Sequence, residues 1–184
     1  MMQLVKKIVV IGPESTGKST LCELLAQHYH TEWCSEFARE YLLSNGTDYT
    51  VDDLLVIAKG QLALEDEVTS AVVHSSSIPT PKQVFIDTDM YVMKVWSEYV
   101  FGACDFFILD TIVQRKYDLY LLCDIDLPWV KDELREYPDE KPRQELFAIY
   151  KDLLMNQATP WAIISGNYEE RLAAAIKAVD GWIK

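Results

Sequence analysis

The sequence predicts an α/β fold in which helices cover both faces of a parallel β-sheet. The alternation of two kinds of segment supports this prediction. Short apolar runs alternate along the chain with longer segments that carry apolar residues at helical spacing. This alternation is typical of parallel sheets, because each crossover connection lays a helix across one face. A chain of 184 residues suffices for one such domain, and we assign residues 1–184 to it.

Five apolar runs are predicted to form the strands. The run at 7–11 is rich in β-branched residues, and the run at 84–86 joins aromatic and β-branched side chains. The run at 119–123 is too short and too apolar for any other element. Shorter runs at 31–34 and 162–165 complete the set.

Six segments are predicted to form helices. In the first of them, Leu21 and Leu25 recur at helical spacing. Gly46 ends the second helix, and Thr50 or Asp52 is suited to cap the third. The predicted helices span 19–29, 36–44, 51–73, 90–101, 144–156 and 168–183.

The composition is that of an acidic globular protein. Apolar residues make up 49% of the chain and charged residues 25%, and 17 basic against 29 acidic side chains give a net charge of −12. Such a chain repels nucleic acids and anionic membranes, so we expect neither as a partner. The four cysteines form no C-x-x-C pair and no cluster with zinc-site spacing, so we expect buried thiols in a reducing compartment. We find neither a signal sequence nor a membrane-spanning run. We therefore expect a cytoplasmic protein, and we predict no oligomeric state.

The first predicted strand leads directly into the pattern G-x-x-x-x-G-K-S, a phosphate-binding loop (P-loop). Its glycines let the backbone wrap around a phosphate, and the loop N–H groups and the following helix attract the anion. Lys18 is predicted to contact the β- and γ-phosphates, and Ser19 to bind Mg²⁺ through its hydroxyl. The residues expected to hold ATP are Gly12, Pro13, Glu14, Ser15, Thr16, Gly17, Lys18, Ser19 and Thr20.

Two aspartates follow the predicted strand at 84–86. A P-loop protein uses an acid in this position to hold Mg²⁺, and we assign that role to Asp87. Asp89 lies two residues further on and is a candidate to face the substrate and take part in catalysis. The alternative is that either aspartate only caps the helix that follows.

The segment after the second predicted strand carries Glu36, Arg39 and Glu40. Ligands of open α/β sheets bind at the carboxyl ends of the strands, so we expect Glu36 and Arg39 to lie over the site near the P-loop. Glu36 is a candidate to accept the proton of an attacking hydroxyl, and Arg39 to bind a substrate group. Ordinary ion pairs along the helix are the alternative.

Residues 124–143 are rich in charge and proline, and we predict that they form a lid. A lid over a nucleoside triphosphate carries cations that reach the transferring phosphoryl group on closure. Arg135 and Arg143 are the candidates, and a solvated loop with paired arginines is the alternative. Asn167, in the turn after the last strand, is a candidate to contact adenine, or else simply begins the helix there.

An early P-loop and late arginines favour a small-molecule kinase over other P-loop proteins. A switch GTPase would need a base-reading N-K-x-D pattern, which the sequence lacks. A motor or transporter ATPase usually has a longer chain. Four aromatic residues are candidates to stack on a base, although core packing is their default role: Trp33, Tyr91, Trp96 and Trp161.

Four motifs in this order resemble the ribosylnicotinamide kinase domain of the NadR family. They are the P-loop at 12–19, E-x-x-R-E at 36–40, I-D-T-D at 86–89 and W-V-x-D-x-L-R at 129–135. The resemblance covers nearly the whole chain. It implies ATP- and Mg²⁺-dependent phosphorylation of the 5′ hydroxyl of nicotinamide riboside, which gives nicotinamide mononucleotide for NAD salvage.

The resemblance also implies roles for single residues. The substrate side of the site would be formed by Glu36, Arg39, Asp87 and Asp89, the metal site by Ser19 and Asp87, and the lid would carry Arg135 and Arg143. Two positions depart from the family pattern: Ser35 stands where tryptophan precedes E-x-x-R-E, with Trp33 two residues earlier, and Glu133 replaces a glycine. Multifunctional NadR proteins also carry a DNA-binding segment and an adenylyltransferase domain, for which we expect no room here.

The fold we predict is therefore a three-layer P-loop domain with a five-stranded parallel sheet in the order 2-3-1-4-5. The predicted function is that of a nucleoside kinase that uses ATP and Mg²⁺. Two alternatives remain: an ATP-binding regulatory or interaction module that hydrolyses ATP slowly, and a kinase for another small metabolite.

Overall fold

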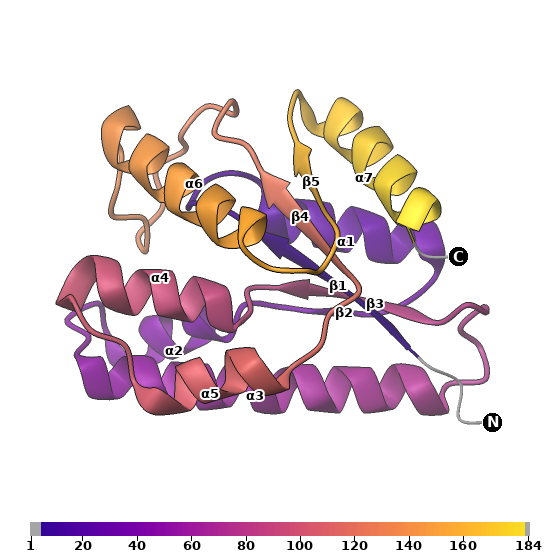
Figure 1. Cartoon of the computed structure of the whole chain (residues 1–184), viewed down its shortest axis with the longest axis horizontal. Coiled ribbons are helices and arrows are strands. Elements are labelled where there is room, and N and C mark those ends of the chain that lie inside the picture. The colour runs from indigo at the N-terminus through magenta and orange to yellow at the C-terminus, as the bar shows by residue number, and fades with distance from the viewer. Residues whose placement is uncertain (1–4, 183–184) are drawn as a thin grey trace.

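A five-stranded parallel sheet organises the chain (Figure 1). The structure, a computed structural model, describes residues 5–182. The strands are β1 (Lys6–Ile11), β2 (Trp33–Cys34), β3 (Gln83–Asp87), β4 (Leu119–Cys123) and β5 (Trp161–Ile164). They lie in the order β2-β3-β1-β4-β5 and every neighbouring pair is parallel, which confirms the predicted topology.

The helices follow the predicted segments closely, with two differences. They are α1 (Lys18–Tyr29), α2 (Phe37–Asn45), α3 (Val51–His74), α4 (Met90–Phe101), α5 (Phe106–Gln114), α6 (Glu140–Met155) and α7 (Tyr168–Trp182). α6 begins at Glu140, so the end of the predicted lid at 124–143 is helical. α5 was not predicted. No helix within residues 5–182 has both the length and the apolar character needed to cross a membrane.

α5 lies in a segment where we expected no helix, and its apolar residues are not confined to the side that faces the core. Asp105 caps the helix, and its carboxylate accepts a hydrogen bond from the Phe107 N–H at 2.7 Å. Phe106 and Val113 are exposed while Ile108 is buried, so apolar residues occur around most of the helix. Part of the apolar side of α5 therefore faces solvent, whereas a surface helix ordinarily turns its apolar side to the core.

Apolar layers hold helices on both faces of the sheet. Ile8 and Val10 of β1 pack in the layer beneath α1 and α7. Val9 and Ile11, which alternate with them, pack in the layer that also contains residues of α3, α4 and α6. A strand buried on both faces reads as a continuous apolar run, which explains the sequence of β1.

The register of the sheet brings the carboxyl ends of three strands together. Val10 pairs with Asp87 of β3, and Ile11 pairs with Leu122 of β4. Gly12, with a φ of 144°, permits this close approach, because a Cβ there would lie 2.8 Å from the Cys123 carbonyl oxygen. Ligands of open α/β sheets bind at this edge.

Candidate active site

The loop between β1 and α1 has the backbone form of a phosphate-binding loop. Gly17 and Ser15 take positive φ values of 75° and 56°. The Thr16 hydroxyl donates to the Pro13 carbonyl at 2.8 Å, and Lys18 Nζ donates to the same oxygen at 2.9 Å. The ammonium group therefore lies across the loop, where it can meet a bound phosphate.

Ser19 and Asp87 meet beside this loop. Ser19 Oγ donates to Asp87 Oδ2 at 2.5 Å, whereas Asp87 Oδ1 is buried without a hydrogen-bond partner among the described residues. Burial, together with repulsion from Glu36, raises the pKa of Asp87 to about 7, against the opposing effects of Lys18 and Ser19. A cation would satisfy the free oxygen and stabilise the carboxylate, so the pair fits Mg²⁺.

The remaining ligands of such a cation would come from phosphate and water. Within residues 5–182, no group of three or more acidic, histidine or cysteine side chains forms a metal site by itself. Mg²⁺ commonly takes only one or two protein carboxylates and completes its coordination with water and substrate phosphates. The donors found here agree with that pattern.

Glu36 lines the same cavity as the P-loop, at the N-terminus of α2. The Thr88 hydroxyl donates to Glu36 Oε1 at 3.4 Å. Thr88 follows Asp87 directly and has a φ of 79°, an unfavourable value for a β-branched residue. Strained backbone of this kind concentrates at functional sites, and here it turns the end of β3 toward Glu36.

Arg39 joins α2 to the segment above the site. Its guanidinium donates to both carboxylate oxygens of Asp132, at 3.3 and 2.9 Å, and this contact lowers the pKa of Asp132. The side chain of Arg39 remains 49% exposed and lines the cavity. The alternative of ion pairs along the helix is not seen among the described residues, where Arg39 instead forms a bidentate pair with Asp132 across the site.

The segment 124–139, which we call the lid, folds down onto the P-loop. The Glu14 carboxylate accepts hydrogen bonds from Trp129 Nε1 at 3.1 Å and from the N–H groups of Glu136 and Tyr137 at 2.9 and 2.7 Å. We expected Glu14 to contact the nucleotide through the P-loop. In this structure its side chain instead accepts hydrogen bonds from the lid, and these bonds connect the P-loop to the lid.

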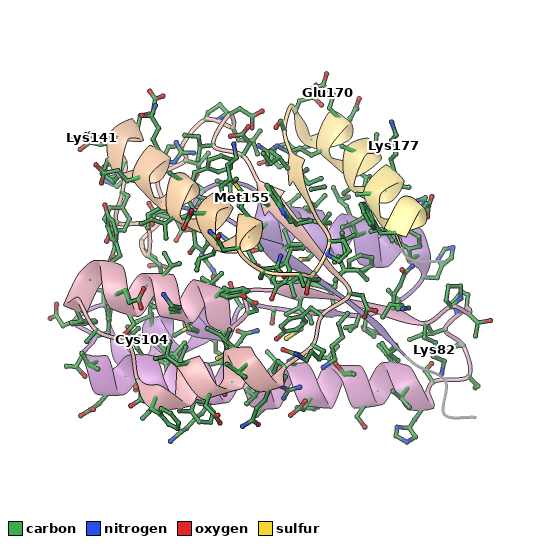
Figure 2. The ribbon with its side chains drawn as sticks, viewed as in Figure 1. Lys82, Cys104, Lys141, Met155, Glu170 and Lys177 are labelled. Carbon is green, nitrogen blue, oxygen red and sulfur yellow. The ribbon has the colours of Figure 1, made fainter. Side chains whose placement is uncertain are left out.

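The two candidate arginines of this region differ in their surroundings. Arg135 lines the cavity and donates to the Val130 carbonyl at 2.5 Å. Arg143 lies in α6 rather than in a loop; it is buried, donates to two lid carbonyls at 3.4 Å each, and leaves its Nε unpaired among the described residues. Lys141, two residues before Arg143, points to solvent at the start of α6 (Figure 2).

Two expected site residues instead begin helices. Asp89 Oδ1 accepts from the first N–H groups of α4 at 3.0 and 3.3 Å, and Oδ2 accepts from the Tyr120 hydroxyl at 2.8 Å. Asn167 Oδ1 accepts from two N–H groups of α7 at 3.0 Å. Neither residue lines the main cavity. The capping alternatives therefore describe both residues better than the predicted contacts to substrate and adenine.

The Asp89→Asn variant should show a weaker pH dependence of stability than the wild-type chain. Burial raises the pKa of Asp89 from 3.8 to about 7. The folded chain therefore binds this proton more tightly than the unfolded chain, and the carboxyl group lowers stability as the pH rises from about 4 to about 7. Asparagine retains an oxygen for the cap but does not titrate. The unfolding free energy of the variant relative to that of the wild-type chain should therefore increase as the pH rises over that range.

Urea denaturation of both proteins at pH 5 and at pH 7.5 measures this difference. Asp87 titrates over the same range in both proteins, so its effect cancels in the comparison. An equal difference in unfolding free energy at the two pH values would contradict the prediction.

Arg171 is a buried residue of the site that no sequence motif marks. Its guanidinium donates to the carbonyl groups of Thr16 and Asp124 at 2.9 Å each and of Gly166 at 2.7 Å, and it pairs with the Asp126 carboxylate. One side chain thereby ties the P-loop to the loops that follow β4 and β5. In the sequence it is indistinguishable from any other arginine of a surface helix.

A cavity of about 580 Å³ extends from the P-loop to a region beneath the lid that is lined by Tyr49 and Trp96 and that we call the aromatic chamber. In the chamber Tyr49 and Trp96 meet edge to face with their ring centroids 5.0 Å apart, and Trp96 Nε1 donates to the Tyr49 hydroxyl at 2.9 Å. Trp33 and Trp96 line the cavity, whereas Tyr91 and Trp161 pack against the core. The volume suits a small organic ligand.

Comparison with known families agrees with this geometry. A family model described as an AAA domain (AAA_28) matches residues 7–171. The chain belongs to this AAA domain family. Among curated proteins, it is 26% and 25% identical to the trifunctional NAD biosynthesis/regulator proteins NadR of Escherichia coli (strain K12) and Salmonella typhimurium. Each alignment covers 95% of this AAA domain chain and 42% of the relative, so the chain spans less than half the length of these relatives.

Solved structures give the same relationship. A NadR protein in complex with NR matches the AAA domain with a TM-score of 0.75 and 26% identity, over 97% of this chain and 49% of that chain. A thymidylate kinase from Ehrlichia chaffeensis, at 14% identity, matches in fold with a TM-score of 0.66 over 95% of this chain and 98% of that chain. The predicted resemblance to NadR and the predicted P-loop fold are both confirmed.

Proposed function

We propose that this AAA domain is a nucleoside kinase that transfers the γ-phosphoryl group of ATP to a hydroxyl of its substrate. The observation that carries the proposal is the cavity, which joins a P-loop, a carboxylate at Glu36 and an aromatic chamber. A nucleotide hydrolase needs the P-loop. A phosphotransferase also needs space for a second organic ligand, which the chamber would provide. The fold shared with a thymidylate kinase is compatible with this activity.

In this proposal the P-loop side of the cavity binds ATP. The N–H groups of residues 12–19 and the Lys18 ammonium hold the phosphates, and Ser19 and Asp87 are the protein ligands of Mg²⁺. Mg²⁺, when bound, neutralises charge on the phosphates. The crystal structure of a NadR protein in complex with NAD and AMP-PNP supports binding of an adenine nucleotide.

The lid and Glu36 complete the proposed machinery. Glu36 orients the substrate hydroxyl and accepts its proton, while the oxygen bonds to the γ-phosphorus and ADP leaves. Arg135 supplies positive charge from the lid at the cavity wall. Arg143 is buried behind the lid, and its Nε, which has no partner among the described residues, adds to that charge. The lid excludes water, which favours transfer to the substrate over hydrolysis.

We propose nicotinamide riboside as the substrate and nicotinamide mononucleotide as the product. The similarity to a NadR protein in complex with NR supports this choice. The chamber also suits a flat cation such as the pyridinium ring of nicotinamide riboside: it presents the rings of Tyr49 and Trp96, and the Tyr49 hydroxyl donates to Glu136 at 3.1 Å. Trp33 lines the cavity near Ser35, where the family pattern has tryptophan.

A nucleoside panel tests the proposal. The purified chain is incubated with ATP, Mg²⁺ and either nicotinamide riboside, nicotinic acid riboside, adenosine, uridine or no acceptor, and ADP is measured. We expect ADP to form with nicotinamide riboside, in equal amount with nicotinamide mononucleotide. Nicotinic acid riboside is the matched control substrate, because its carboxylate should be repelled by Glu136, which bonds Tyr49 in the chamber.

Other outcomes of the panel would select the alternatives. Equal ADP formation in all samples would contradict the kinase and favour a module with slow ATPase activity. Turnover with a different acceptor alone would contradict the assignment of nicotinamide riboside but not the transfer reaction.

A further inference from the structure

Gln61 is a buried polar residue in the middle of α3, and the sequence motifs do not include it. Only 1% of its surface is exposed. Burying an amide is unfavourable unless its donors and its acceptor are paired, so the partners of this side chain indicate why it is there.

The hydrogen bonds of Gln61 reach both acid-bearing segments of the site. Oε1 accepts from the Phe37 N–H at 2.7 Å, and Nε2 donates to the Ser35 carbonyl at 3.2 Å. These two peptide groups flank Glu36 on either side. Nε2 also contacts the carbonyl oxygen of Asp87 at 3.4 Å. A single amide therefore holds the backbone around Glu36 and at Asp87.

The hydrogen bonds of Gln61 lie just beyond the last paired residues of β2 and β3. β2 has two residues, and its ladder with β3 consists of the pairs Trp33 with Phe85 and Cys34 with Ile86. Past these pairs the described residues show no further β2–β3 pairing, so the sheet does not set the separation of Glu36 from the end of β3. The amide of Gln61 takes the place of the missing ladder.

Gly60 supports the same segment from the same helix. A Cβ at this position would lie 2.2 Å from Cε1 of the Phe37 ring, so a larger residue would displace the ring. Glycine within a helix is destabilising relative to alanine. Its position here allows the turn that carries Glu36 to pack directly against α3, next to Gln61.

We propose that Gln61 is a positioning residue for phosphoryl transfer, which acts by fixing Glu36 relative to Asp87. The inference rests on the proposed kinase function. Small displacements of groups that act in transfer are costly, because a shift of about 1 Å reduces rates by about 100-fold. Gln61 touches neither the P-loop nor the lid through its hydrogen bonds, so its loss should affect the transfer step more than ATP binding.

The Gln61→Met variant tests the inference, because methionine is similar in length but makes none of these hydrogen bonds. We expect kcat with nicotinamide riboside to fall by about 10- to 100-fold, and KM for ATP to change by less than about 3-fold. In a Glu36→Gln background the same substitution should have little further effect on kcat, since the group that it positions has already been removed. A purely structural role would give equal losses in both backgrounds.

Glu65→Gln is the matched control. Glu65 is buried to the same extent on the same helix, but it bonds Lys7 at 2.7 Å and Tyr117 at 2.8 Å, away from the cavity. This variant should lower the thermal midpoint and leave kcat unchanged. If Gln61→Met does not fold, as judged by circular dichroism, then Gln61→Asn, whose amide is one methylene too short, is measured in the same way.

The outcomes separate this inference from the function on which it rests. A folded Gln61 variant with wild-type kcat, or equal losses in the two backgrounds, would overturn the positioning role alone. A wild-type chain without acceptor-dependent ADP formation would overturn the proposed kinase and the positioning role together.

Discussion

Replacing Lys18 with alanine should abolish phosphoryl transfer while the fold stays intact. The ammonium group lies across the P-loop, 2.9 Å from the Pro13 carbonyl, and no other described lysine lines the cavity. Loss of a preorganised group that stabilises transition-state charge costs on the order of 10³-fold in kcat. The fold should tolerate the change, because alanine has the highest helix propensity and Lys18 is the first residue of α1.

ADP formation with nicotinamide riboside, together with the thermal midpoint, measures both parts of this result. Lys177→Ala is the matched control, since Lys177 is exposed on α7 (Figure 2) and should change neither quantity. Transfer at the wild-type rate by Lys18→Ala would show that the loop at 12–19 does not bind the reacting phosphate.

The carboxyl edge of the sheet was predictable because its residues follow strands directly. The P-loop follows β1, Glu36 lies just past β2, and Asp87 ends β3. The same rule selected Asp89 and Asn167, whose side chains cap helices in the structure. A polar residue between a strand and a helix suits a ligand and a helix cap equally well, and only the structure shows that N–H groups already occupy these oxygens.

Residues that act through the backbone of distant segments could not be found from the sequence. Gln61 bonds Phe37, 24 positions away, and Arg171 bonds Thr16, 155 positions away. Neither contact involves a pattern of neighbouring residues, so no motif records it. α5 is a different case, because Phe106 and Val113 are exposed although apolar residues of a surface helix ordinarily face the core.

The Glu36→Gln variant should lose most of its transfer activity and retain the proposed Mg²⁺ site at Ser19 and Asp87. Removal of a general base lowers kcat by about 10²- to 10⁴-fold. Repulsion from Glu36 contributes to the raised pKa of Asp87, so the substitution should lower that pKa. A larger fraction of Asp87 is then ionised at pH 6, and Mg²⁺ should support ATP binding there at lower concentration than in the wild-type chain.

Two measurements on this variant distinguish a base from a metal ligand. Acceptor-dependent ADP formation gives kcat, and calorimetric titration of ATP at several Mg²⁺ concentrations gives the metal dependence. Glu40→Gln, one helical turn further along α2 on an exposed side chain, should alter neither. If kcat falls but more Mg²⁺ is needed at pH 6, Glu36 serves the metal rather than the hydroxyl. If kcat is unchanged, the proton leaves by another route and the role that we assign to Glu36 is wrong.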